Sequence, residues 1–167
     1  MIKKQLDFLK NLSVKLKQSN SSNEKKIVLN HFFNENNLLF DKIFDYILSY
    51  DKKYWVTSEN ISKLWEKFPH KYNFNEHDDL FLVLDKITCR EITGYDAINY
   101  IIDLINFCGD EYKEYIFNII DKDLKANVNV SLVNKISSNS VKEFKVALAE
   151  RSDEAPMVHK INFDNEF

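Results

Sequence analysis

Residues 121–136, DKDLKANVNVSLVNKI, place lysine and asparagine side chains around a turn that can expose backbone N–H groups. An apolar helical run, 112–120, leads directly into this segment. We expect Asn127 to end that helix in a left-handed conformation, for which Asn is the best substitute for Gly. Asn129 or Ser131 can then cap a short following helix. Free N–H groups at a helix start, beside lysines, favour a bound anion.

Three lysines flank this turn, Lys122, Lys125 and Lys135. They allow two interpretations: a capped helix-turn-helix whose lysines are merely solvated, or a turn that binds phosphate. Spacing alone favours the first interpretation, because Asn caps are common.

Other chemistry-bearing residues favour structural roles. The cluster His70, Glu76, His77, Asp78 and Asp79 has neither the i, i+4 pair nor the Cys spacing of a metal site, so we predict no metal.

The remaining carboxylates and thiols also lack the spacing of a catalytic or metal site. Asp121 and Asp123 are two apart and should face different directions on a helix, so we predict no catalytic pair. Cys89 and Cys108 lack metal spacing, and we expect two buried thiols in a reducing cytoplasm.

Exposed cations and aromatic rings could also contact nucleic acid. Lys52 and Lys53 could contact phosphate or merely be solvated, whereas Lys25 and Lys26 should lie on a solvated helix face. Four aromatic residues could stack on bases, although core packing is the better expectation for most of them. These are Trp55, Trp65, Tyr95 and Tyr100.

The amino-acid composition limits which fold classes are plausible. The 167 residues contain only two Gly and two Pro, which disfavours a turn-rich β fold and favours long helices. Apolar runs stay well short of the ~18 residues of a membrane span, and we expect a cytoplasmic monomer. The net charge of −3 does not exclude a local basic face that binds phosphate.

Helical periodicity predicts an all-α domain of seven or eight helices over residues 1–137. Residues 138–167 should form a linker, with one short strand possible at 144–148. The expected helices cover 2–16, 24–33, 38–50, 58–68, 78–90, 94–107, 112–120 and a short stretch within 129–136. The expected core includes Leu39, Ile43, Leu84, Ile98, Ile101, Ile116 and Ile120.

Two of these helices have sequence signals at their ends. Ser58 should cap the fourth helix and Pro69 should end it. Thr93 should cap the sixth, with Asp96 completing a capping box.

Several collinear motifs resemble the N-terminal DNA-binding domain of ATP-dependent DNA ligases, especially those of tailed phages. In that family an apolar helix runs into Arg-Asp-Leu, a turn with Gly, then Val-Ser and Asn-Lys. The matching residues here are Lys122, Asp123, Leu124, Val130, Ser131, Asn134 and Lys135. Two positions depart from the pattern: Lys122 stands for Arg, which loses its bidentate fork, and Asn127 stands for Gly.

Further matches lie in the same order along residues 40–154. REITGYDAI, at 90–98, is similar to the family's Arg-x-Leu-Thr-Gly-x-x-Ala-Ile, and 50–56 is similar to the segment after its third helix. LAERSDE, at 148–154, is similar to the lead-in to the nucleotidyltransferase domain.

The resemblance implies a domain that grips duplex DNA around a nick from its minor-groove side, without reading sequence, in replication, repair or recombination. The expected DNA contacts are Lys52, Lys53, Arg90, Thr93, Gly94, Lys122, Lys125, Asn127, Asn129, Ser131, Asn134 and Lys135.

Catalysis is not expected of this chain. The family attaches AMP to the Lys of a Lys-x-Asp-Gly motif, and neither Gly94 nor Gly109 belongs to such a motif. We therefore expect no catalytic residue and no bound cofactor, since ATP and Mg²⁺ would act in the parent enzyme. The alternative interpretation is a helical protein-interaction module, for example one that docks on a replication sliding clamp.

Overall fold

Helices form all the regular secondary structure in the part of the chain that the computed structural model describes, residues 1–138 and 141–143. The all-α class predicted from the sequence is confirmed. The expected strand at 144–148 lies outside the described residues. The elements are α1 (Ile2–Gln18), α2 (Ser22–Glu35), α3 (Asn37–Leu48), α4 (Ser58–Lys63), α5 (Leu80–Thr88), α6 (Gly94–Cys108), the 3₁₀ turn η1 (Asp110–Tyr112), α7 (Lys113–Ile120) and α8 (Val130–Asn134).

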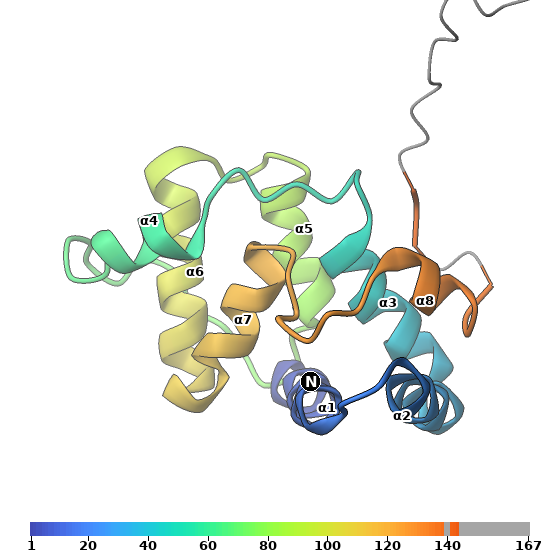
Figure 1. Ribbon diagram of the computed structural model, residues 1–167. Coiled ribbons are helices and arrows are strands. Elements are labelled where there is room, and N and C mark those ends of the chain that lie inside the picture. The colour runs from blue at the N-terminus through green and yellow to red at the C-terminus, as the bar shows by residue number, and fades with distance from the viewer. Residues whose placement is uncertain (139–140, 144–167) are drawn as a thin grey trace, which may run out of the picture.

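Helix α7 lies near the middle of the bundle in Figure 1, and it packs against α1 and α3. Helix α2 packs against both α1 and α3, and α4 packs against α6. The segment that follows α7 leads across to α8 on the right of the view, the same side as α2. None of the described helices has the combined length and hydrophobicity that crossing a bilayer requires.

Side-chain caps define most of the helix starts. Ser21 and Glu24 form a reciprocal capping box at α2. Asn36 accepts from the Leu39 N–H and starts α3, which explains the break between two otherwise continuous helices. Asn129 accepts from the Leu132 N–H at 2.9 Å, so the cap predicted for α8 is confirmed.

Helix α4 differs from the expected helix at both ends. Thr57, not Ser58, provides its cap, because the Ser58 hydroxyl donates to Asp121 instead. The helix also ends at Lys63, before the expected stop at Pro69.

Helices α5 and α6 also begin or end differently. Asp79 caps α5, and the helix ends at Thr88, so the expected span 78–90 was too long at both ends. The capping box expected at α6 is absent: Thr93 makes no side-chain cap bond, and the Asp96 carboxylate pairs with Lys71 Nζ at 2.8 Å.

Six of the seven predicted core residues are buried, namely Ile43, Leu84, Ile98, Ile101, Ile116 and Ile120. Leu39 is only half-buried at the edge of this core. Cys108 is buried, which raises the pKa of its thiol to about 11. Cys89 is exposed, so the prediction of two buried thiols was wrong for this residue, which directly follows the end of α5.

Of the four aromatic residues considered for base stacking, two belong to the core and two are exposed. Tyr100 is buried and Trp65 is half-buried, as core packing requires. Trp55 and Tyr95, however, are 62% and 68% exposed. The expectation that most of these rings belong to the core therefore fails for two of them.

Candidate nucleic-acid interface

A polar hollow of about 240 Å³ lies between the first turn of α2 and the segment that enters α8. Four of the predicted contact residues line it: Asn127, Asn129, Ser131 and Lys135. Its other lining residues are Ser22, Lys25, Lys26 and Leu132. The fold therefore brings three lysines from two distant parts of the chain to one concave surface.

The charges around this hollow are of one sign. Among the described residues, no carboxylate forms an ion pair with Lys25, Lys26 or Lys135. Like charges that gather without counter-charges create a positive potential, which a bound anion would neutralise. The sequence interpretation had placed Lys25 and Lys26 on a merely solvated face, and the structure places them at the hollow.

The turn that leads into the hollow uses left-handed backbone conformations three times. Lys122, Lys125 and Asn127 have φ values of 58°, 52° and 51°. The left-handed conformation expected at Asn127 is confirmed, but this residue does not end a helix. Helix α7 ends earlier, at Ile120, with Asp121 as its C-cap.

The half-buried side chain of Lys122 is held by internal hydrogen bonds. Its Nζ donates to the carbonyl oxygen of Lys52 at 2.6 Å and to that of Ser49. Burial lowers the pKa of this ammonium, since desolvation disfavours the charged form. These contacts give Lys122 a structural task, the attachment of the turn to the segment that follows α3.

Asp121 makes a second attachment of the same kind. Its carboxylate accepts from the Ser58 backbone N–H at 2.9 Å and from the Ser58 hydroxyl. The Asp123 carboxylate instead accepts from the Lys125 N–H at 2.7 Å. Their different directions agree with the structural roles expected for both carboxylates.

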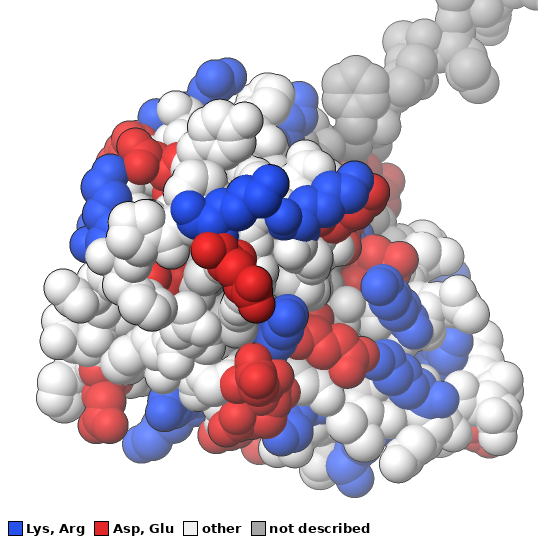
Figure 2. All heavy atoms as spheres, turned by 90° about the vertical axis from the view of Figure 1, so that its left-hand side faces the viewer, with Lys and Arg blue, Asp and Glu red and all other residues white. Residues whose placement is uncertain are grey.

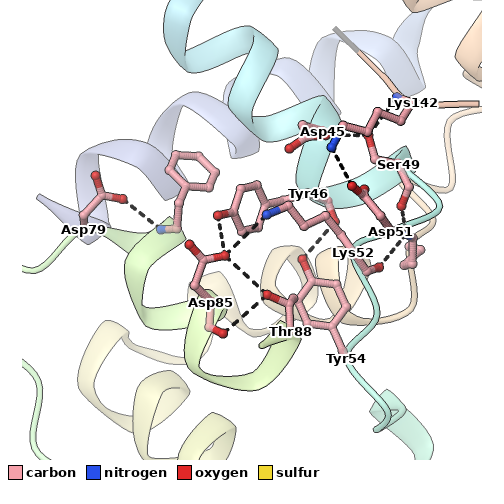
Figure 3. A network of polar contacts seen from close by, with 12 residues as sticks. Asp45, Tyr46, Ser49, Asp51, Lys52, Tyr54, Asp79, Asp85, Thr88 and Lys142 are labelled. Atoms are coloured by element: carbon pink, nitrogen blue, oxygen red, sulfur yellow. Dashed lines mark hydrogen bonds and ion pairs between the residues drawn. The ribbon is translucent and has the colours of Figure 1, made fainter. Parts of the chain in front are cut away.

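Lys52 belongs to the polar network drawn in Figure 3. Its Nζ lies 3.4 Å from Asp85 Oδ1 and 4.1 Å from the ring centroid of Tyr46. The Tyr46 hydroxyl donates to the same carboxylate at 2.6 Å, and burial, followed by this bond, raises the pKa of Tyr46 well above its usual value. Lys52 thus connects the segment after α3 to α5.

Lys142 also contacts the segment that follows α3. Its backbone N–H donates to Ser49 Oγ at 3.0 Å, and its Nζ lies 2.6 Å from Asp51 Oδ2. Asn134 holds the same part of the chain, because its amide exchanges two 3.1 Å hydrogen bonds with the backbone of Val141.

A second group of predicted contact residues lies between α5 and α6. Arg90 and Gly94 have φ values of 62° and 61°, and both are exposed together with Thr93. A Cβ added at Gly94 would meet no atom within 4 Å, so its left-handed φ, not crowding, favours glycine there. The Arg90 guanidinium stacks on the Trp55 ring, 4.9 Å from its centroid, and the Lys53 ammonium lies 5.6 Å from the same centroid.

The opposite side of the molecule has a mixed charge. Figure 2 shows the left-hand side of Figure 1, where basic and acidic side chains are interspersed. The pairs Lys63–Glu59, at 2.5 Å, and Lys71–Asp96, at 2.8 Å, belong to α4, to α6 and to the loop before α5. Paired charges of this kind give little net potential, in contrast to the hollow.

Acidic and histidine side chains form no metal centre in the described residues, where no group of three or more could hold an ion. His70 and Asp103 instead make a structural contact, with the His70 ring 2.7 Å from a carboxylate that also accepts from the Lys71 and Tyr72 N–H groups.

The predicted contacts therefore fall into three sets. Asn127, Asn129, Ser131 and Lys135 share the hollow, with Lys125 exposed nearby in the sequence. Lys53, Arg90, Thr93 and Gly94 are exposed near Trp55 or at the start of α6. The third set, whose side chains are engaged in internal contacts, is Lys52, Lys122 and Asn134.

The chain resembles known proteins in structure and not in sequence. Neither a protein-family model nor a curated protein matches this sequence. The solved structure Pmar-Lig_PreS3, a ligase by its name, matches with a TM-score of 0.57 at 18% identity, over 77% of this chain. The chain spans 29% of the length of that structure. The fold of this chain is therefore similar to part of that structure.

Proposed function

We propose that this chain binds nicked duplex DNA without reading its sequence, as the DNA-binding domain of an ATP-dependent DNA ligase. The observation that carries the proposal is the hollow of about 240 Å³ in which Lys25, Lys26 and Lys135 gather and which no carboxylate of the described residues lines. The likeness to Pmar-Lig_PreS3 supports the same class of function.

The chemistry of the hollow suits phosphate. A water molecule occupies about 30 Å³ in the liquid, so the hollow can hold a phosphate group with several waters. Lysine ammoniums act on phosphate as point charges, and such contacts fix the position of a duplex without identifying its bases.

The role of the domain would be to position DNA. In the parent ligase it would hold the nick where the adenylated lysine can act, and binding of this kind raises the effective concentration of the reacting groups. ATP and Mg²⁺ would belong to the catalytic part, because this sequence has no Lys-x-Asp-Gly. We propose that the chain acts in the cytoplasm as a monomer.

A salt titration tests this proposal. The affinity for a nicked duplex should fall steeply with salt, and each lost phosphate contact should reduce the log–log slope by about 0.9. Lys25→Ala, Lys26→Ala and Lys135→Ala should each weaken binding, equally on two duplexes of unrelated sequence.

Lys63→Ala is the matched control, because Lys63 is an exposed lysine paired with Glu59 on another side of the molecule. It should leave affinity and slope unchanged. Unchanged slopes for all three hollow variants would refute phosphate binding at this surface.

A second candidate function, docking of a protein such as a sliding clamp, rests on a different surface. Leu38 is 73% exposed beside a hollow of about 570 Å³ that Leu39 and Phe81 help to line. Apolar docking would depend little on salt, so Leu38→Ser should weaken clamp binding and leave DNA binding intact.

A further inference from the structure

Trp55 is turned outward by a strained backbone. Its φ of 61° is unusual for a bulky residue, and strained conformations of this kind are often found at functional sites. The residues on either side are anchored, since Tyr54 is 2% and Val56 8% exposed. The Tyr54 hydroxyl donates to the Tyr46 carbonyl at 2.8 Å. The chain therefore holds two neighbours inside and presents an indole ring, 62% exposed, between them.

Two cations accompany this ring. The Arg90 guanidinium carbon lies 4.9 Å and the Lys53 ammonium 5.6 Å from the ring centroid. In the described part of the chain, neither cation forms an ion pair with a carboxylate. Arg90 also has a left-handed backbone, with φ of 62°, directly after the end of α5. Two separate segments thus place an aromatic ring and two unpaired cations together at the surface.

We propose that Trp55 stacks on an unpaired nucleobase while Arg90 and Lys53 neutralise the adjoining phosphates. An aromatic ring beside free cations is the combination that binds single-stranded nucleic acid, and stacking on it tolerates any base. A base inside a duplex exposes only its edges in the grooves, so the ring face needs an unstacked nucleotide. The inference rests on the proposed function for its class of ligand, and it adds a preference for DNA that carries unpaired nucleotides near the bound duplex.

Fluorescence can report this contact directly, because the chain has only two tryptophans. In a Trp65→Phe variant, Trp55 is the single reporter. Titration with a duplex that contains a three-nucleotide gap should quench its emission, and titration with the same duplex nicked but ungapped should quench it much less. The gapped duplex should also bind roughly 5-fold or more tightly, the range that one stacked base contributes.

Substitutions separate stacking from charge. Trp55→Ala should abolish the preference for the gapped duplex and leave the salt slope unchanged, and Trp55→Tyr should restore most of the preference. Tyr95→Ala is the matched control, since Tyr95 is 68% exposed and, among the described residues, has no cation over its ring. It should keep the full preference.

The outcomes distinguish the two proposals. Equal affinity for gapped and nicked duplexes without quenching, while nicked duplex still binds with a steep salt dependence, would overturn the stacking inference alone. Absence of binding to either duplex at low salt would overturn the proposed function and the inference with it. Quenching together with a preference that Trp55→Ala removes would establish the site.

Discussion

Lys122 and Lys135 lie in one short segment and carry the same charge, yet the fold gives them opposite surroundings. Lys122 is half-buried, and its ammonium donates to the carbonyls of Ser49 and Lys52. Lys135 lines an open hollow and has no carboxylate partner among the described residues. The comparison shows that the role of a lysine depends on the groups that its ammonium contacts in the fold, not on its position in a sequence motif.

The same division extends over the surrounding structure. Lys52, Asp121 and Lys142, like Lys122, make internal contacts that hold the turn and its neighbours; we call these four residues the fastened side. Lys25 and Lys26 lie with Lys135 at the hollow, which we call the open side. We expect the fastened side to control the stability of the fold and the open side to control binding to DNA.

The largest effect should follow from Lys122→Met. This change keeps most of the aliphatic stem but removes the donor from two carbonyls, and hydrogen bonds to charged groups contribute about 1.5–3 kcal/mol each. Because desolvation of the ammonium offsets part of this gain, we expect a loss of about 2–3 kcal/mol in the free energy of unfolding. Chemical denaturation checks this value.

Lys125→Ala is the matched control for Lys122→Met, since Lys125 is exposed and shares a left-handed backbone three residues later. It should change stability by no more than about 0.5 kcal/mol. A loss of equal size for both variants would remove the distinction between fastened and free lysines.

Asp121→Ala should have the next largest effect. It removes the acceptor of the Ser58 N–H and hydroxyl, and it should cost about 1–3 kcal/mol. Ser58→Ala loses only the hydroxyl bond and should cost less. At a temperature where both variants are folded, their salt slope for DNA binding should match that of the parent chain; a flatter slope would place Asp121 on the binding side.

Asn127 tests the link between the two sides, because it belongs to the fastened turn and also lines the hollow. Asn127→Val should cost about 1–2 kcal/mol, since a β-branched residue resists a φ of 51°. It should also weaken DNA binding by displacing the wall of the hollow. Asn127→Gly permits the same φ and should leave both properties nearly unchanged. If Val is tolerated as well as Gly, the turn conformation is not required.

Local signals predicted much of this fold. Apolar spacing identified most of the helices, and residue type alone predicted a cap at Asn129 or Ser131 and the left-handed backbone at Asn127. Such features depend on neighbours within one or two turns of the chain. The cap of α4 at Thr57 was not predictable in this way, because the Ser58 hydroxyl donates to Asp121, 63 residues away.

The candidate site shows the same limit. Half of the hollow, contributed by Asn127, Asn129, Ser131 and Lys135, was predicted from one continuous segment. Lys25 and Lys26 were missed because no local pattern tells which distant helix will face that segment. Core packing was expected for most of the four aromatic residues that include Trp55, with base stacking left open. No local pattern showed that a left-handed backbone between two buried neighbours turns Trp55 outward.

The smallest predicted effect concerns acid, and it again separates the two sides. The hydrogen bond from Lys142 lowers the pKa of the Asp51 carboxyl below its ordinary 3.8, although slight burial opposes the shift. A carboxyl whose pKa is lowered in the folded state stabilises the fold above the pKa of the unfolded chain, and this contribution is lost as the pH falls through the folded value. Both groups are exposed, so the contribution should be modest and should weaken with salt. We therefore expect Lys142→Ala to unfold at a slightly lower temperature than the parent at pH 7, and the difference to vanish well below pH 3.8. Lys135→Ala, which leaves no carboxylate unpaired, should show no such convergence. A constant difference between Lys142→Ala and the parent across this pH range would mean that the ion pair with Asp51 does not help to hold the fastened side.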